Sequence, residues 1–285
     1  MGKKVAVAFV HGMGSHDKDF ANEFMGRILD QCEPTCGTDV IVRPVHWSPA
    51  MQNKEEELLR RLKRSDQSMS WMPIRKMLID LLADALAYQI TATDRRMYDE
   101  IHARFAGTLA RLAREAGADA PLCIVAHSLG AIIASNFIYD LQYDSVDKPL
   151  ITEIVRASMA DTPLERGETL TKLYTLGNPL ALWSLRYQDF GLPIRVPSPP
   201  PAFRETHPQI VSEWINIYDQ DDVIGFPLKT LNAAYGEAVT ADEQINVGGL
   251  VEFWNPGSHT EYDNSQRVIN LIAAGIIQTW QTVNA

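Results

Sequence analysis

Three side chains that could perform nucleophilic catalysis together lie far apart in the sequence. Ser128 stands in Ala126-His-Ser-Leu-Gly130, with a small residue two positions before it and two after it. Asp222 follows an apolar segment, and His259 lies on a glycine-containing loop before the last predicted helix. A serine hydroxyl becomes a nucleophile when a histidine accepts its proton and a carboxylate orients that histidine. These residue types therefore predict covalent acyl chemistry.

The elements around Ser128 must hold its hydroxyl in an accessible position. The apolar run Leu122–Val125 predicts a strand buried on both faces, and small residues at Ala131 and Ala134 predict a helix packed tightly beneath it. A strand that turns straight into a helix strains the backbone of the intervening serine and lifts its hydroxyl above the sheet edge. The same turn aims the positive end of the helix at any developing negative charge.

This strand–turn–helix pattern resembles the nucleophile elbow of the α/β-hydrolase superfamily, in its lipase/esterase-like branch. The alternative is an ordinary strand–helix turn with a capping serine. After the predicted strand Val5–Val10, the segment His11-Gly-Met-Gly14 resembles the oxyanion loop of lipase-like hydrolases. The resemblance implies that the N–H groups of Met13 and Leu129 hold the oxyanion. A phosphate-binding loop would need Gly-Lys-Ser/Thr, and a dinucleotide site would need a third glycine.

Three aspartates compete for the role of the acid after the predicted strand 214–218: Asp219, Asp221 and Asp222. The stretch resembles the Asn-Phe-Tyr-x-x-x-Asp-x-Val-Ala-Tyr pattern of intracellular phospholipase-type hydrolases, and an alignment without gaps from Asn216 ends on Asp222. The commoner Asp-x-Val-Val pattern selects Asp221 instead. We favour Asp222, keep Asp221 as the alternative, and expect Asp219 to be a turn residue.

The segment Ser258-His259-x-x-Tyr262 resembles the histidine loop of the same superfamily. The alternative for His259 is an exposed loop histidine. His127 adjoins the nucleophile, and its side chain is expected to point away from that of Ser128. For the remaining histidines we expect local, structural or surface roles: His11, His16, His46, His102 and His207.

Together these motifs predict the α/β class and an α/β-hydrolase fold of about six mostly parallel strands with helices on both faces. The two edge strands that usually precede the oxyanion strand are expected to be absent. Residues 48–118 are too long for a simple crossover, so they predict a helical insertion that either caps the site or thickens one face. A proline-rich, lid-like segment spans residues 192–208. We expect one domain over residues 1–285.

Composition limits the partners. The 285-residue chain has a net charge of −10, which disfavours nucleic acid and anionic membrane surfaces. The first apolar run is too short for a signal peptide or an integral membrane segment, so a cytoplasmic location is expected. Cys123 is expected to be buried, while Cys32 and Cys36 lack a second Cys/His pair for zinc. The expected chemistry requires neither a metal nor another cofactor.

The predicted function is hydrolysis of a carboxylic ester of a small molecule or lipid through an acyl-enzyme. An acyltransferase with the same acyl-enzyme and a catalytically silent binding protein are the alternatives. An apolar acyl part is expected, because the candidate covers of the site offer apolar side chains: Met72, Met77, Tyr88, Ile194, Val196 and Phe203. Acyl length, the alcohol part and the oligomeric state stay open.

Overall fold

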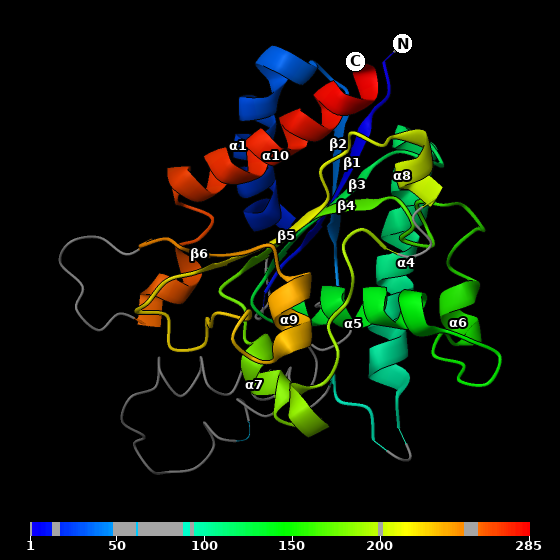
Figure 1. Ribbon diagram of the computed structural model, residues 1–285, viewed down its shortest axis with the longest axis vertical. Coiled ribbons are helices and arrows are strands. Elements are labelled where there is room, and N and C mark those ends of the chain that lie inside the picture. The colour runs from blue at the N-terminus through cyan, green and yellow to red at the C-terminus, as the bar shows by residue number, and fades with distance from the viewer. Residues whose placement is uncertain are drawn as a thin grey trace.

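Six strands build one parallel sheet in the order β2-β1-β3-β4-β5-β6 (Figure 1). The structure is a computed structural model that describes residues 2–12, 18–47, 61, 88–91, 94–198, 202–247 and 256–285. All five strand pairs are parallel. The strands are β1 Val5–Val10, β2 Val40–Val45, β3 Leu122–His127, β4 Leu170–Leu176, β5 Glu213–Tyr218 and β6 Ala241–Gln244. The expected α/β class and six-stranded sheet are confirmed.

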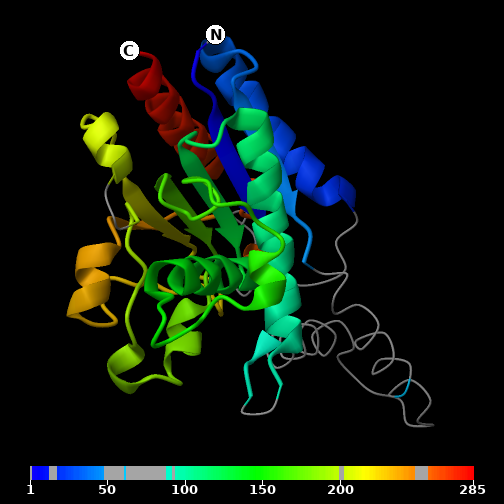
Figure 2. The same ribbon diagram turned by 90° about the vertical axis from the view of Figure 1, so that its right-hand side faces the viewer.

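Helices cover both faces of this sheet, as expected (Figure 2). The long ones are α1 Lys18–Cys36, α4 Arg96–Ala116, α5 Leu129–Tyr143 and α10 Gln266–Asn284. Short helices lie in the connections: α6 Glu153–Arg156, α7 Leu180–Ser184, α8 Ala202–Thr206 and α9 Ala233–Ala238, with 3₁₀ turns η2 Gln188–Phe190 and η3 Pro256–Thr260.

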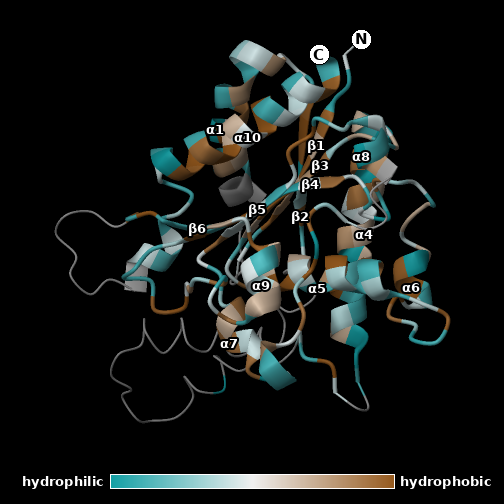
Figure 3. Cartoon of the chain, in the orientation of Figure 1, coloured by the Kyte–Doolittle hydropathy of each residue, from teal (hydrophilic) through white to brown (hydrophobic). Residues whose placement is uncertain are grey.

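Alternate side chains of β1 enter two separate cores, because successive strand residues face opposite sides of a sheet. Val5, Val7 and Phe9 pack with the apolar faces of α1 and α10. Ala6, Ala8 and Val10 pack with α4 and α5, where the smaller alanines let the helices approach the sheet. Every residue of β1 is buried, which explains its uninterrupted apolar sequence. Figure 3 shows the same pattern as apolar central strands flanked by helices with one polar face.

The last strand begins earlier than predicted. The sequence predicts a short last strand over residues 243–247, whereas β6 is Ala241–Gln244, paired in parallel register with β5. An edge strand that is only partly buried needs no apolar alternation, so hydrophobicity did not reveal it. The apolar residue Ile245 follows the strand and packs in the core beneath it.

The proline-rich segment does not run over the site in its described parts. The side chain of Gln142 on α5 binds the backbone N–H of Arg195 at 2.9 Å and donates to Ser198 Oγ at 2.8 Å. Further on, His207 Nε2 lies 3.0 Å from Lys3 Nζ, just before β1 begins. Residues 202–208 therefore lie at the amino end of the sheet, at the opposite end from Ser128 (Figure 1).

The strand order creates a topological switch point between β1 and β3. The chain leaves β1 toward β2 on one side, then crosses back to β3 and continues outward on the other side. Crevices form at such points above the carboxyl ends of parallel strands, where α/β proteins bind their ligands. Of the expected helical insertion, α4 is the crossover helix between β2 and β3, and most of residues 48–93 lie outside the described ranges. No helix in the described part is long and apolar enough to span a membrane.

Candidate catalytic site

Ser128 is the single residue between β3 and α5, at the switch point. Its backbone has φ 54° and ψ −128°, in a region that residues with a side chain rarely adopt. Such strain persists where the surrounding structure determines it, and it is typical of functional sites. The serine is 1% exposed. The sequence-based expectation of a strained strand-to-helix turn thus matches the observed backbone.

Two glycines let the exits of β1 and β3 approach each other at this turn. A side chain at Gly130 would collide with the carbonyl oxygens of Val10 and His11. A Cβ at Gly12 would stand 2.8 Å from the Cβ of Ser128. Both positions therefore require glycine for close backbone packing, which brings the loop after β1 against the serine.

The structure joins Ser128, His259 and Asp222 in one chain of hydrogen bonds. His259 Nε2 lies 2.8 Å from Ser128 Oγ. On the other side of the ring, Nδ1 lies 3.0 Å from Asp222 Oδ2 and 3.1 Å from Oδ1. All three side chains are buried. Because a carboxylate only accepts, Nδ1 carries the proton and Nε2 is free to accept the serine proton.

Asp222 is held in its ionised form. Burial alone raises the pKa of its carboxyl group, but the hydrogen bond from His259, and the positive charge of that ring when it is protonated, act against burial and prevail. The backbone N–H of Ile224, at 3.0 Å, and the hydroxyl of Tyr262, at 2.8 Å, add to this effect. The net result is a pKa below the ordinary value, so Asp222 is charged at neutral pH.

The other two aspartates of this loop have different surroundings. Asp221 is exposed, and its backbone N–H donates to Asp219 Oδ1 at 2.8 Å. Asp219 Oδ2 accepts the backbone N–H of Val247 at 2.6 Å. Asp219 therefore organises the turn, as expected, and the geometry places Asp222 rather than Asp221 beside His259.

Tyr262 links the acid loop to the histidine loop. Its hydroxyl donates to Asp222 Oδ2 and accepts the backbone N–H of Asp219 at 2.8 Å. Burial raises the pKa of Tyr262 far above its usual value, so the hydroxyl keeps its proton and can donate. Glycines make room for this contact. A Cβ at Gly177 or Gly225 would meet Asp222 Oδ2 within 3 Å.

One of the two expected oxyanion donors is described. Leu129 is the first residue of α5, so its N–H has no acceptor inside the helix. That N–H sits at the positive end of the α5 dipole, directly after Ser128. Met13 lies outside the described residues, together with His16.

A contact that sequence reasoning missed involves His127. Its Nε2 lies 2.8 Å from the carbonyl oxygen of His259, and the two rings are 5.0 Å apart. The sequence predicts only that His127 points away from Ser128, and it does not predict this contact with His259. A histidine next to the nucleophile, combined with a histidine loop, was the available signal, but only the folded chain shows that they meet.

Three further described histidines contact other side chains. His11 stacks on Trp47, His102 is buried against Asp140, and His207 lies near Lys3. Burial raises the pKa of both Cys32 and Cys123 to about 12, which opposes thiolate formation and metal binding. In the described ranges, no three His, Cys, Asp or Glu side chains are grouped to hold a metal.

Four of the six apolar side chains expected to cover the site are described. Ile194 is 1% exposed and Val196 packs against the same core, so both are core residues. Phe203 belongs to the segment at the amino end of the sheet. Tyr88 is buried and lines a cavity beside α5. Met72 and Met77 lie outside the described residues.

The chain matches no protein-family model, and no curated protein or solved structure is similar to it. What the protein does must therefore follow from its own side chains: a strained, buried serine joined to a histidine and an ionised aspartate at the carboxyl edge of a parallel sheet.

Proposed function

We propose that this protein is a serine hydrolase of the α/β-hydrolase type that cleaves carboxylic esters. The observation that carries the proposal is the continuous chain from Ser128 Oγ through the His259 ring to Asp222, with distances of 2.8 and 3.0 Å. A buried serine has no structural need for a histidine that an ionised carboxylate orients. The same arrangement is what an activated nucleophile requires.

The fold assignment rests on the order and position of these residues. Ser, Asp and His follow one another in the chain order of α/β-hydrolases. The nucleophile follows β3, the acid follows β5, and the histidine follows β6. The strand-to-helix turn at Ser128 and the switch point beside it support the same assignment.

In the first half of the reaction, His259 Nε2 removes the proton from Ser128 Oγ as the oxygen attacks the acyl carbonyl carbon. The carbonyl oxygen becomes an oxyanion, which the N–H of Leu129 is placed to bind, together with the donor expected at Met13. The ester bond then breaks. His259 gives its proton to the departing alcohol, and the acyl group remains on Ser128.

In the second half, His259 removes a proton from water, and the resulting hydroxide attacks the acyl carbon. Ser128 regains its proton when the carboxylic acid leaves. Asp222 stays ionised throughout and stabilises the imidazolium that forms twice in the cycle. Every step uses groups of this chain, water and the substrate.

A fluorophosphonate probe tests the assignment, because only an activated serine reacts with it. The wild-type protein should be labelled on Ser128 alone, and Ser128→Ala should abolish labelling. Ser198→Ala, which changes another buried serine, serves as the control and should be labelled normally. Ester turnover should fall by about 10⁴-fold or more in Ser128→Ala. Labelling that persists in this variant would overturn the proposal.

The acyl part of the substrate is expected to be apolar. Ser128 is 1% exposed, so an acyl group that reaches its hydroxyl must be transferred from water into the protein interior. Each buried methylene contributes about 0.8 kcal/mol, and four more carbons would raise kcat/KM roughly a hundredfold. Nitrophenyl esters from acetate to palmitate should therefore show a maximum at intermediate length. A flat profile, or faster cleavage of peptide amides, contradicts this substrate class.

A competing alcohol added to the assay distinguishes hydrolysis from acyl transfer, because an acyltransferase would form a new ester with that alcohol.

A further inference from the structure

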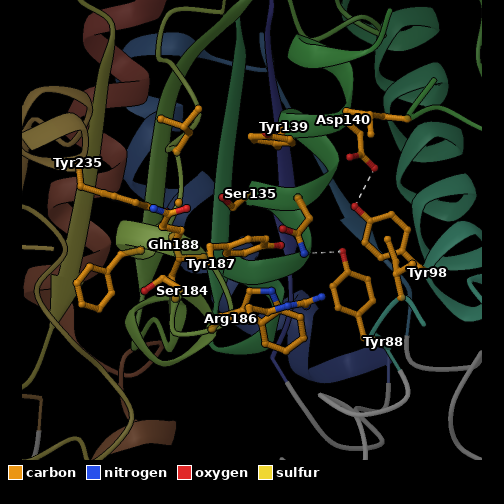
Figure 4. Close-up of a pocket in the computed structure, with 18 of the residues that line it drawn as sticks. Tyr88, Tyr98, Ser135, Tyr139, Asp140, Ser184, Arg186, Tyr187, Gln188 and Tyr235 are labelled. Atoms are coloured by element: carbon orange, nitrogen blue, oxygen red, sulfur yellow. Dashed lines mark hydrogen bonds between the residues drawn. The ribbon is translucent and has the colours of Figure 1, made fainter. Parts of the chain in front are cut away.

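A cavity of about 420 Å³ lies beside the outer part of α5 and is closed by α7 and the segment that follows it (Figure 4). This volume is within the range of small-molecule sites. None of Ser128, Asp222 and His259 lines it. It is therefore separate from the proposed catalytic residues, although α7 begins only three positions after Gly177, which adjoins them.

Aromatic and aliphatic side chains make up much of the wall and the mouth of this cavity. Its aromatic residues are Tyr88, Tyr139, Trp183, Tyr187, Phe190 and Tyr235. At the mouth, large apolar side chains stay exposed to solvent: Ile90 is 40% exposed and Leu192 is 61% exposed. Exposed apolar side chains gathered around a concavity are typical of a binding site, because burying them would be favourable.

A fixed network of hydrogen bonds forms the inner wall. Tyr88 Oη lies 2.7 Å from His102 Nε2, and His102 Nδ1 lies 3.2 Å from Asp140 Oδ2. Tyr98 also donates to Asp140 Oδ2, at 2.8 Å. Burial lowers the pKa of His102 despite the nearby carboxylate, so the ring is neutral and its Nδ1–H donates to Asp140. The inner wall is thus preorganised, and Asp140 already has two donors.

Ser135 provides an unused polar group on this wall. It is 7% exposed, lies in the interior of α5 and lines the cavity. A serine within a helix often donates to the carbonyl group four residues earlier. Ser135 makes no hydrogen bond through its side chain within the described part of the chain. Figure 4 shows it facing the space between Tyr187 and Asp140. Its hydroxyl is available to a polar atom inside the cavity.

Two cations lie in the lining of the cavity and give it positive charge. The Arg186 guanidinium lies 5.1 Å from the ring centre of Trp183 and 5.3 Å from that of Tyr187. Lys148 Nζ lies 5.9 Å from the ring centre of Tyr139. Neither cation has a carboxylate partner among the described residues. Stacking on aromatic rings holds both cations at the lining, where they favour an anion.

We propose that this cavity is a second ligand site, for a small amphipathic carboxylate. The apolar body lies between the aromatic walls, the carboxylate binds Arg186 and Lys148, and a hydroxyl or carbonyl oxygen at the inner end bonds with Ser135. Figure 4 shows Asp140 and Arg186 at separate parts of the cavity, so the carboxylate can bind Arg186 away from Asp140.

Calorimetric titration of the Ser128→Ala protein tests the charge preference without turnover. Decanoate should bind about tenfold more tightly than decanol or decylammonium. The double variant Arg186→Gln/Lys148→Gln should remove this difference, whereas Arg195→Gln, an exposed arginine outside the cavity, should retain it. Equal affinities for the three probes, or an unchanged preference in the double variant, would overturn the proposal.

A second titration locates the site and tests its inner end. ω-Hydroxydecanoate should bind about three- to tenfold more tightly than decanoate, and Ser135→Ala should cancel this gain while leaving decanoate binding unchanged. Ser135→Leu should fill the inner space and weaken both ligands, with thermal unfolding as the check on its fold. Unchanged binding by a folded Ser135→Leu protein would place the carboxylate elsewhere and refute the site.

Discussion

His127 donates its Nε2 proton to the carbonyl oxygen of His259, at 2.8 Å. The donor direction follows because a carbonyl group only accepts. The residue directly before the proposed nucleophile thus holds the backbone of the proposed general base. A Cβ at Gly12 would stand 3.1 Å from His127 Nδ1, so the same ring also borders the loop after β1. Three loops that carry the proposed chemistry therefore meet at His127.

His127→Leu should lower kcat by about tenfold with little change in KM, because the His259 loop loses its donor while the substrate contacts remain. His127→Gln keeps an N–H donor and should restore part of the activity. Steady-state kinetics of the two variants, with thermal unfolding as the control, distinguish positioning from general stability. Equal activity of the leucine variant and the wild type would refute this role.

Asp222→Asn should lose about 10⁴-fold in turnover, since an amide favours the wrong tautomer of His259 and leaves its cation without support. Asp221→Asn is the matched control, because Asp221 is the adjacent, exposed aspartate. It should remain within about twofold of the wild type. If the Asp221 variant proves to be the weaker enzyme, the observed pairing of Asp222 with His259 is not the one used in catalysis.

Much of the sheet could be predicted because burial on both faces leaves a clear signal. β1 and β3 are nearly continuous apolar runs, and each ends in a glycine-bearing turn. The strand-to-helix turn at Ser128 could be predicted for a different reason. A short residue two positions on either side of the serine is a local steric requirement, and it can be seen in the sequence.

Other features depend on contacts between distant segments. β6 is a polar edge strand, so its position follows from pairing with β5 and not from hydrophobicity. The path of residues 202–208 to the amino end of the sheet depends on Gln142 and Lys3, which lie far away in the sequence. The choice between Asp221 and Asp222 likewise required knowing which carboxylate the loop turns inward.

Tyr262→Phe should reduce kcat by about tenfold, because Asp222 loses one of the donors that hold it against His259. The change removes a single oxygen and leaves the backbone N–H of Asp219 without its acceptor, so the free energy of unfolding should also fall by about 1–3 kcal/mol. Kinetics and urea unfolding report the two effects separately. Tyr218→Phe, on the adjacent strand end, is the control for loss of a tyrosine hydroxyl. A Tyr262→Phe protein with wild-type kcat and wild-type free energy of unfolding would contradict both predicted effects.

Asp263→Asn should stabilise the protein at pH 8. Burial, with a contribution from Glu261, raises the pKa of Asp263 to about 6, and its Oδ1 has no hydrogen-bond partner. The folded chain therefore holds a proton between about pH 4 and pH 6 that the unfolded chain has released, so ionisation above pH 6 opposes folding. Because the Asp263 side chain is only partly buried, the substitution should raise the free energy of unfolding by on the order of 1 kcal/mol. Urea unfolding should show this higher free energy of unfolding at pH 8. The difference should vanish near pH 4, where the wild-type carboxyl group is protonated in the folded state. The exposed Asp30→Asn control should show no such pH dependence. A gain that is the same at both pH values would mean that the carboxylate charge is not its cause.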